Sequence, residues 1–237
     1  QYTLDTPGTV PNRQDKTHPH STFPDPSGAF LISADLGADV VRVFAISESG
    51  TLTECPDASA SPGTGPRHGA FWEGGNSTVL YTVNELGNSV SSWEVTSGDC
   101  LTLTENQIIS TYPEGTTPPE GTKAAEILIR DNFLYASNRF DKTFGETSDS
   151  IALFEIGEDG ALTFVELADS GANFPRTMDI NAAGDMIAVG GQTSSDVVIL
   201  ERDSTSGRLG SVLAKLQVGK LGGEGQEDGL SGVVWVE

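Results

Sequence analysis

The chain has 237 residues, with 13 basic side chains against 34 acidic ones and a formal net charge of −21. This balance excludes the cationic surface with which proteins bind nucleic acid or an anionic membrane. No apolar run reaches the roughly 20 residues of a transmembrane helix. The 28 glycines and 12 prolines are spaced along the chain as turns, which favours many short strands over disorder.

A sequence unit recurs four times at intervals of about 50 residues. Each unit contains four short runs rich in β-branched and aromatic residues, divided by Gly, Asn, Asp and Ser turns. In chain order, strands are expected within 18–28, 29–35, 39–46, 50–55, 66–71, 79–85, 89–95, 100–105, 124–129, 133–139, 150–156, 160–166, 175–180, 186–191, 196–202 and 207–214. The residues that close the second run of each unit are interpreted as equivalent: Asp35, Glu85, Arg139 and Gln192.

Four antiparallel strands per unit are typical of a β-propeller blade, so the predicted fold class is all-β. A β-sandwich or barrel is the alternative, but it would not repeat one turn pattern four times. Four full blades are expected at 17–61, 62–118, 119–171 and 172–219. They are preceded by a remnant of another blade at 1–16, with a strand at 2–5, and followed by the start of a last blade at 220–237. Because fragments at both ends would leave strand edges unpaired, we expect a larger ring whose first blades are absent from this chain.

Motifs at the expected strand ends resemble those of a known family. They are His18-Pro19-His20, Gly65-Pro66-Arg67-His68, Thr82-Val83-Asn84-Glu85-Leu86, Tyr135-Ala136-Ser137-Asn138-Arg139 and Phe174-Pro175-Arg176. The chain resembles the seven-bladed lactonase propellers, which include bacterial-type 6-phosphogluconolactonases and fungal 3-carboxy-cis,cis-muconate lactonizing enzymes. The resemblance implies a fungal secreted member in which this chain supplies about four full blades, and the N-terminal blades are a separate fragment or chain.

The resemblance also implies one pocket formed by four catalytic residues: His20, Arg67, Glu85 and Arg139. Two guanidinium groups can hold a carboxylate or phosphate through forked hydrogen bonds. For lactone hydrolysis, Glu85 or His20 would activate water, while Arg67 and Arg139 would stabilise the oxyanion and hold the anionic group of the substrate. For a muconate-type cyclisation, the carboxylate of the substrate is the nucleophile, and His20 or Glu85 would move the proton. The expected substrate-binding residues are His18, His68, Glu126, Asn138, Arg176 and Gln192.

Each of these residues also has a structural interpretation. The His-Pro-His turn can cap a blade, and Arg139 can form an ion pair with Asp141. The Glu85 carboxylate can satisfy the hydrogen-bonding groups of a turn. No metal site is expected, because the chain has neither a HExxH motif nor a multi-histidine spacing. No cofactor is expected, since the glycine-rich loops lack the helix that a phosphate cradle requires.

Two cysteines and one sequon bear on the compartment. Cys55 and Cys100 fall near the outer strands of neighbouring units, so a disulfide between them is expected in a secreted chain, with buried or free thiols as the alternative. Asn76 begins an Asn-Ser-Thr sequon and is a candidate glycosylation site. A secreted location is favoured, with the cytoplasm as the alternative.

Two functions from different classes remain open at this stage. The first is a lactonase-like enzyme, 6-phosphogluconolactonase-like or muconate cycloisomerase-like, whose partner is a small-molecule lactone or sugar acid. The second is a non-catalytic propeller that binds a ligand or another protein, because one fold hosts many functions. A phosphorylated substrate is not expected outside the cell, so a non-phosphorylated acid is favoured.

Overall fold

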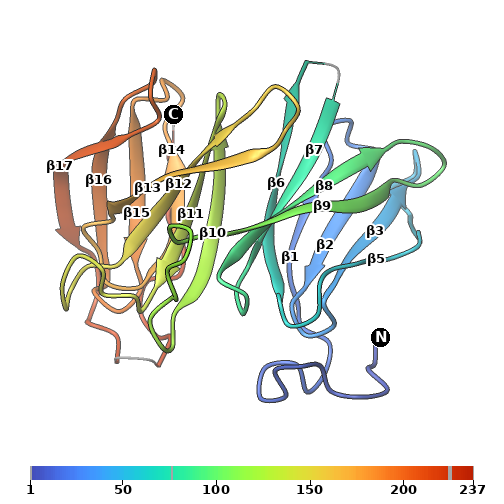
Figure 1. The fold of residues 1–237 in the computed structure, drawn as a ribbon, viewed down its shortest axis with the longest axis horizontal. Coiled ribbons are helices and arrows are strands. Elements are labelled where there is room, and N and C mark those ends of the chain that lie inside the picture. The colour runs from blue at the N-terminus through green and yellow to red at the C-terminus, as the bar shows by residue number, and fades with distance from the viewer. Residues whose placement is uncertain (1, 76, 224–225, 237) are drawn as a thin grey trace. The chain divides into compact units, whose positions relative to one another are not determined.

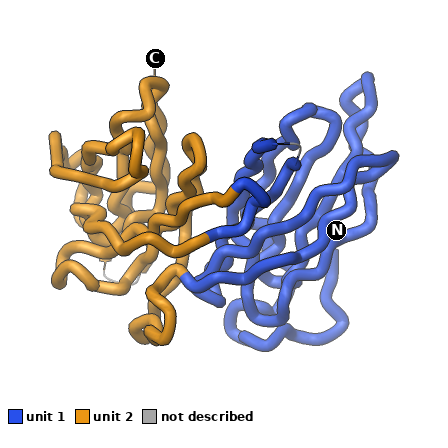
Figure 2. The backbone as a smooth tube through the Cα atoms, turned by 45° about the horizontal axis from the view of Figure 1, so that its top comes forward, with its two compact units in different colours: residues 1–110, 158–162 blue, residues 111–157, 163–237 orange. Residues whose placement is uncertain are grey.

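The computed structural model describes residues 2–75, 77–223 and 226–236. Its secondary structure consists of seventeen strands in four antiparallel sheets, and no helix in this part of the chain could cross a membrane. Figure 1 shows the four sheets. The chain divides into two units, residues 1–110 with 158–162 and residues 111–157 with 163–237 (Figure 2). The candidate glycosylation site Asn76 lies outside the described residues.

Unit 1 contains two sheets, each a meander of sequential strands. The first sheet has the order β1-β2-β3-β4, with β5 also pairing with β3, and the second has the order β6-β7-β8-β9. The strands are β1 (Pro19–Pro24), β2 (Phe30–Asp35), β3 (Val40–Ile46), β4 (Leu52–Glu54), β5 (Ala58–Ser59), β6 (Pro66–Gly74), β7 (Ser77–Asn84), β8 (Ser89–Thr96) and β9 (Thr102–Ser110).

Unit 2 repeats this arrangement in two further four-stranded sheets, with the orders β10-β11-β12-β13 and β14-β15-β16-β17. The strands are β10 (Lys123–Arg130), β11 (Phe133–Arg139), β12 (Ser150–Ile156), β13 (Leu162–Asp169), β14 (Pro175–Ile180), β15 (Met186–Gly191), β16 (Asp196–Arg202) and β17 (Leu209–Gln217). The turn at 158–162, between β12 and β13, is grouped with unit 1. The predicted all-β class of four-stranded antiparallel blades is confirmed.

Each unit has its own apolar core. The core of unit 1 contains Phe30, Ile32, Val41, Val43, Leu80, Trp93 and Leu103. The core of unit 2 contains Tyr135, Ile151, Leu153, Met178, Ile187, Val189, Val198 and Leu200. These residues come from strands in which alternate side chains point to opposite faces of a sheet. Within each unit, burial of one sheet face against the other sheet holds the strand ends, and thus the site residues, in place.

The disulfide expected from the sequence is confirmed. Cys55 and Cys100 are bonded, with their Cα atoms 5.7 Å apart. Both residues belong to or pack against the core of unit 1. The bond therefore links the outer parts of the two sheets of this unit.

The strand expected at 2–5 is wrong, because these residues have no regular secondary structure. Tyr2 is held by its side chain instead. Its ring lies under the guanidinium of Arg42, with 3.7 Å between the guanidinium carbon and the ring centroid. Its hydroxyl donates to Glu54 at 2.7 Å. Side-chain contacts thus replace strand pairing at this end of the first sheet.

Candidate active site

The first strand of every sheet carries a β-bulge near its start. Register shifts separate Pro19 from Ser21, Pro66 from His68, Ala124 from Ile127 and Pro175 from Thr177. The residues displaced at these bulges are His20, Arg67, Ala125, Glu126 and Arg176. In three of the four strands a proline precedes the bulge, and proline, which has no N–H group to donate to the ladder, is accommodated on edge strands and at bulges. Bulges re-aim side chains next to active sites, and all but one of the displaced residues are predicted site residues.

A second set of predicted residues lies at the end of the neighbouring strand. The Glu85 amide donates to the carbonyl of Gly65, and the Gln192 amide donates to that of Phe174, each at 2.9 Å. In the first sheet the corresponding bond runs from Leu36 to His18 at 3.1 Å. Leu36 is therefore the structural equivalent of Glu85, and the assignment of Asp35 to this position was wrong by one residue.

Glu85 accepts hydrogen bonds from two guanidinium groups. Arg67 Nε donates to Glu85 Oε2 at 3.0 Å, and Arg13 Nη2 donates to Glu85 Oε1. Glu85 is 2% exposed and Arg67 is 1% exposed, whereas the Arg13 side chain is 32% exposed. The carboxylate is thus balanced by a buried and a half-exposed cation. Opposite charges in contact are what a buried carboxylate requires.

Arg13 is a site residue that the sequence did not identify. The segment that carries it is fixed by Gln14, whose fully buried side chain donates to the carbonyl of Leu36 at 3.1 Å and accepts from the amide of Val10 at 3.0 Å. No motif marks Arg13, and it lies 72 residues from Glu85. Only the three-dimensional structure brings these two residues together.

The three histidines of the chain all belong to unit 1. His20, which is exposed, has its ring centroid 5.1 Å from that of half-buried His68. The two strands are tied together next to the bulges, because the Ser21 hydroxyl donates to the Arg67 carbonyl at 2.7 Å. The Nε2 atom of His18 lies 3.1 Å from Asp15 Oδ1, and this bond lowers the pKa of Asp15. Unit 1 therefore brings His20 and His68 together on the two strands that are joined at Arg67, whose guanidinium binds Glu85.

In unit 2, Arg139 is fully buried at the end of β11. Its guanidinium donates to the carbonyls of Lys123 at 3.4 Å and Ala124 at 3.3 Å, and it lies 5.1 Å from the ring centroid of Phe174. Asp141 accepts from the hydroxyls of Tyr112, Thr143 and Ser150. Asn138 donates to Ser150 Oγ at 3.0 Å, which fits a structural role.

The other predicted residues of unit 2 have mixed environments. The carboxylate of half-buried Glu126 accepts from the amide of Ile127 at 3.2 Å. Buried Gln192 donates to the carbonyl of Glu227 at 2.6 Å, and the Glu227 carboxylate binds Lys123 at 2.6 Å. Arg176, at its bulge, is half-buried. The roles of these residues, like that of Arg139, stay predictions.

A buried carboxylate fixes the backbone around Arg139. Asp149 accepts from the amides of Phe140, Lys142 and Phe174. Phe140 and Phe174 have positive φ angles of 63° and 62°, a conformation that is uncommon for residues other than glycine. Burial raises the pKa of Asp149. Within the described residues, no group of three or more His, Cys, Asp or Glu side chains could hold a metal ion.

The comparisons with known proteins agree with this arrangement. Residues 1–222 match the family described as "Lactonase, 7-bladed beta-propeller". The chain belongs to this lactonase family. It is 34% identical over 207 residues to the "Probable 6-phosphogluconolactonase" of Arthroderma benhamiae, covering 85% of this chain and 51% of that protein. It is 31% identical over 200 residues to the 6-phosphogluconolactonase of Bacillus subtilis, covering 83% of this chain and 54% of that protein.

Among solved structures, the lactonase chain is similar to the periplasmic gluconolactonase of Pseudomonas aeruginosa. The TM-score is 0.76 at 26% identity, over 92% of this chain and 59% of that one. A protein from Lactobacillus plantarum also gives 0.76 at 30% identity, over 88% and 57%. The chain thus spans little more than half the length of these relatives. They support a lactone hydrolase and give no support to the muconate cyclisation.

Proposed function

We propose that this lactonase chain contributes the catalytic residues for hydrolysis of a sugar-acid lactone. The observation that carries the proposal is the placement of His20. This exposed imidazole lies on a bulge, next to His68 and to the strand that holds Arg67. Several relatives named as lactone hydrolases support the same chemistry.

The proposed reaction proceeds by general-base catalysis. His20 removes a proton from water while the water oxygen attacks the carbonyl carbon of the lactone. The acyl C–O bond of the ring then breaks, and protonated His20 returns the proton to the ring oxygen. The product is the open hydroxy acid, and no redox step is involved. Arg67 and Arg13 supply positive charge for the oxyanion.

Glu85 is a positioning residue in this mechanism. Both of its carboxylate oxygens accept from arginines, and its side chain is buried. A water molecule would have to displace one of these charge-assisted bonds to be activated by Glu85. The exposed imidazole of His20 can be reached by water, so we assign the base to His20 rather than to Glu85.

The proposed substrate is a non-phosphorylated lactone outside the cytoplasm. The disulfide between Cys55 and Cys100 supports an oxidising compartment. The net charge of −21 disfavours a highly charged anion at long range. The similarity to a periplasmic gluconolactonase supports the same substrate class.

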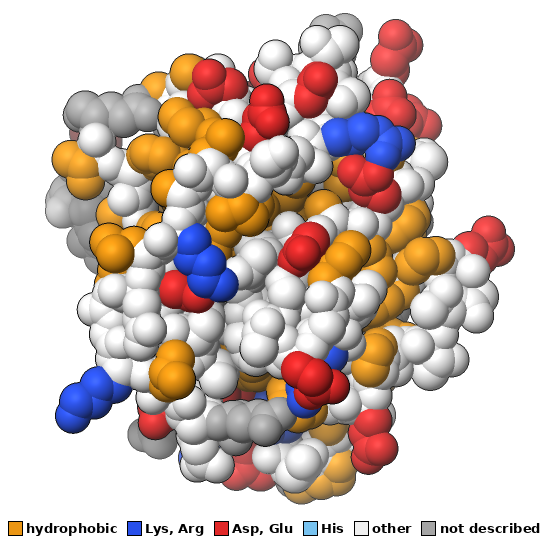
Figure 3. Space-filling model, turned by 90° about the vertical axis from the view of Figure 1, so that its left-hand side faces the viewer, with side chains coloured by type: hydrophobic (Ala, Val, Ile, Leu, Met, Phe, Trp, Pro, Cys, Tyr) orange, Lys and Arg blue, Asp and Glu red, His pale blue; other side chains and the backbone are white. Residues whose placement is uncertain are grey.

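We further propose that additional blades of the same ring cover β17. Buried and exposed side chains do not alternate along β17, the last strand of unit 2. Large apolar side chains are exposed there: Val212 51%, Leu213 54% and Leu216 67%. Figure 3 shows this side of the molecule, with hydrophobic side chains at the surface. The segment after β17 returns to β14, where the amide of Trp235 donates to Asp179 Oδ2 at 2.8 Å. Mass measurement of the natively purified protein tests this proposal: a further fragment supports it, and a monomer of this chain alone contradicts it.

Activity is tested by proton release from glucono-δ-lactone, 6-phosphogluconolactone and other sugar lactones. We expect turnover by the natively purified protein, with the non-phosphorylated lactone preferred. A preference for the phosphorylated lactone would contradict the substrate assignment. Absence of hydrolysis with every lactone would contradict the enzyme and favour a binding propeller.

A further inference from the structure

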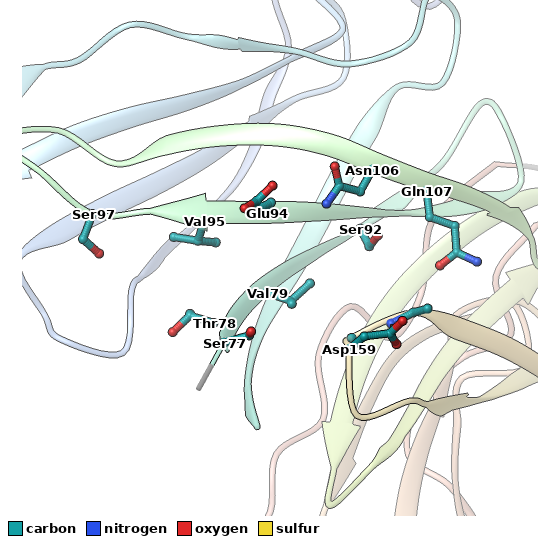
Figure 4. A pocket seen from close by; sticks show the side chains of 12 residues that line it. Ser77, Thr78, Val79, Ser92, Glu94, Val95, Ser97, Asn106, Gln107 and Asp159 are labelled. Atoms are coloured by element: carbon teal, nitrogen blue, oxygen red, sulfur yellow. The ribbon is translucent and has the colours of Figure 1, made fainter. Parts of the chain in front are cut away.

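Unit 1 contains a groove that takes no part in the proposed hydrolysis. It has a volume of about 680 Å³ and lies against β7, β8 and β9, with the turn at 159–161 forming one wall (Figure 4). Ligand pockets commonly measure roughly 300–1,000 Å³. The groove is therefore large enough for a ligand of the size of a sugar or disaccharide.

The walls of the groove are held by hydrogen bonds. The side-chain amide of Gln107 accepts from the Leu162 amide at 2.8 Å and donates to its carbonyl at 2.9 Å. The Tyr81 hydroxyl donates to the Gly160 carbonyl at 2.7 Å. Gly160 has a φ of 78°, and a Cβ atom there would lie 2.6 Å from Val79. The turn is thus fixed on the sheet, and the groove is formed before any ligand binds.

The lining is polar and carries negative charge. Hydroxyl and amide groups come from Ser77, Thr78, Ser92, Ser97, Asn106 and Gln107. Carboxylates come from Glu94 and Asp159, and the lining contains no basic or aromatic side chain. Asp159 Oδ1 accepts from the Ala161 amide at 3.0 Å, whereas Glu94 is exposed to the groove (Figure 4).

Ser92 places a hydroxyl group in the groove, apart from the two carboxylates. It is 4% exposed and lines the groove. Within the described part of the chain, its hydroxyl has no hydrogen-bond partner. A hydroxyl both donates and accepts, so a ligand hydroxyl in the groove can pair with it.

We propose that this groove binds a hydroxylated amine, the class to which amino sugars belong. Carboxylates at Glu94 and Asp159 favour an ammonium group, while the hydroxyl and amide groups match the hydroxyls of a sugar ring. The same carboxylates repel anions. The groove therefore excludes the acid that lactone hydrolysis produces, and it is a separate site from the one around His20.

The probe is the disaccharide of β-1,4-linked glucosamine, titrated into the natively purified protein by calorimetry. Its N-acetylated form tests the ammonium group, and spermidine, an amine without hydroxyls, tests the sugar hydroxyls. We expect saturable binding of the glucosamine disaccharide, with both other compounds at least about tenfold weaker. Equal binding of either compound would overturn the proposal.

Glu94→Gln should weaken binding of the glucosamine disaccharide about tenfold, and Ser92→Leu, which fills the groove, should abolish it. Glu48→Gln, at an exposed acid outside the groove, is the matched control and should bind as the unchanged protein does. Thermal unfolding of each variant checks its fold. If Glu94→Gln and Glu48→Gln bind alike, or if Ser92→Leu folds and still binds, the proposal is wrong.

Discussion

Arg67 and Glu85 form a buried ion pair, in which Arg67 Nε donates to Glu85 Oε2 at 3.0 Å. Arg67 comes from the bulge of β6, and Glu85 follows the end of β7. The pairing joins the bulge of the first strand to the end of the second strand, two positions that both carry predicted site residues in three of the four described sheets. Because Arg13 binds the other carboxylate oxygen, both oxygens of Glu85 are occupied by arginines. The proposed mechanism therefore assigns the proton transfer to His20.

Glu85→Gln should lower the free energy of unfolding by roughly 3 kcal/mol, because breaking a buried ion pair leaves an uncompensated buried charge. Urea denaturation measures the effect. Glu48→Gln, at an exposed acid in the same unit, should change the free energy of unfolding by less than about 0.5 kcal/mol. Equal stability of the two variants would show that the pair has no net role in stability.

The two arginines around Glu85 should differ in their effect on stability. Arg67→Ala removes the buried partner and should cost roughly 3 kcal/mol. Arg13→Ala removes a partner whose side chain is 32% exposed and should cost about 1 kcal/mol. Chemical denaturation of the two variants compares them. A larger loss in Arg13→Ala would mean that the N-terminal segment, rather than the ion pair, stabilises this region.

Most strands could be predicted because turn residues separate them. The strands β11, β12, β14, β15 and β16 begin and end where the sequence placed them, since Gly, Asn, Asp and Ser turns bound each one. The strand expected at 2–5 was wrong, because a run with strand propensity forms no strand without an edge to pair with. The sequence pattern of residues 2–5 does not show whether a neighbouring strand edge is available to them.

The candidate site was predictable only in part. His20, Arg67 and Glu85 follow recognisable motifs, so they could be named. The offset between Asp35 and Leu36 is visible only in the strand pairing, where Asp35 lies opposite Pro19 as Asn84 lies opposite Pro66. The contact from Arg13 to Glu85 spans 72 residues, and no local signal encodes it. Such pairings depend on how β1, β6 and β7 pack.

Removal of the disulfide should destabilise unit 1. The bond closes a loop with a sequence separation of 45 residues, for which the chain-entropy relation gives about 4 kcal/mol. The double variant Cys55→Ser with Cys100→Ser should therefore unfold at a lower temperature than the unchanged protein. Calorimetry with and without reductant measures the change. A reductant effect that persists in the double variant would point to a cause other than this bond.

Asp149 should make stability depend on pH. Burial raises the pKa of its carboxyl above the ordinary value of 3.8, so the folded chain keeps the proton to a higher pH than the unfolded chain does. The contribution of Asp149 to the free energy of unfolding therefore decreases as the pH rises through the raised pKa. Relative to Asp149→Asn, the unchanged protein should lose stability in urea denaturation as the pH rises above 3.8 and through the raised pKa. A difference that grows with pH would contradict the direction of the shift.

The central claim is that His20 moves the proton in lactone hydrolysis and Glu85 positions the arginines. It is tested most directly by the pH dependence of kcat for glucono-δ-lactone in the natively purified protein, His20→Gln and Glu85→Gln. We expect His20→Gln to fold normally, to lose about 100-fold in kcat, and to lose the acid limb that protonation of the base produces. Glu85→Gln should be slower but keep that limb. Full activity in His20→Gln, or loss of the limb in Glu85→Gln alone, would contradict the account.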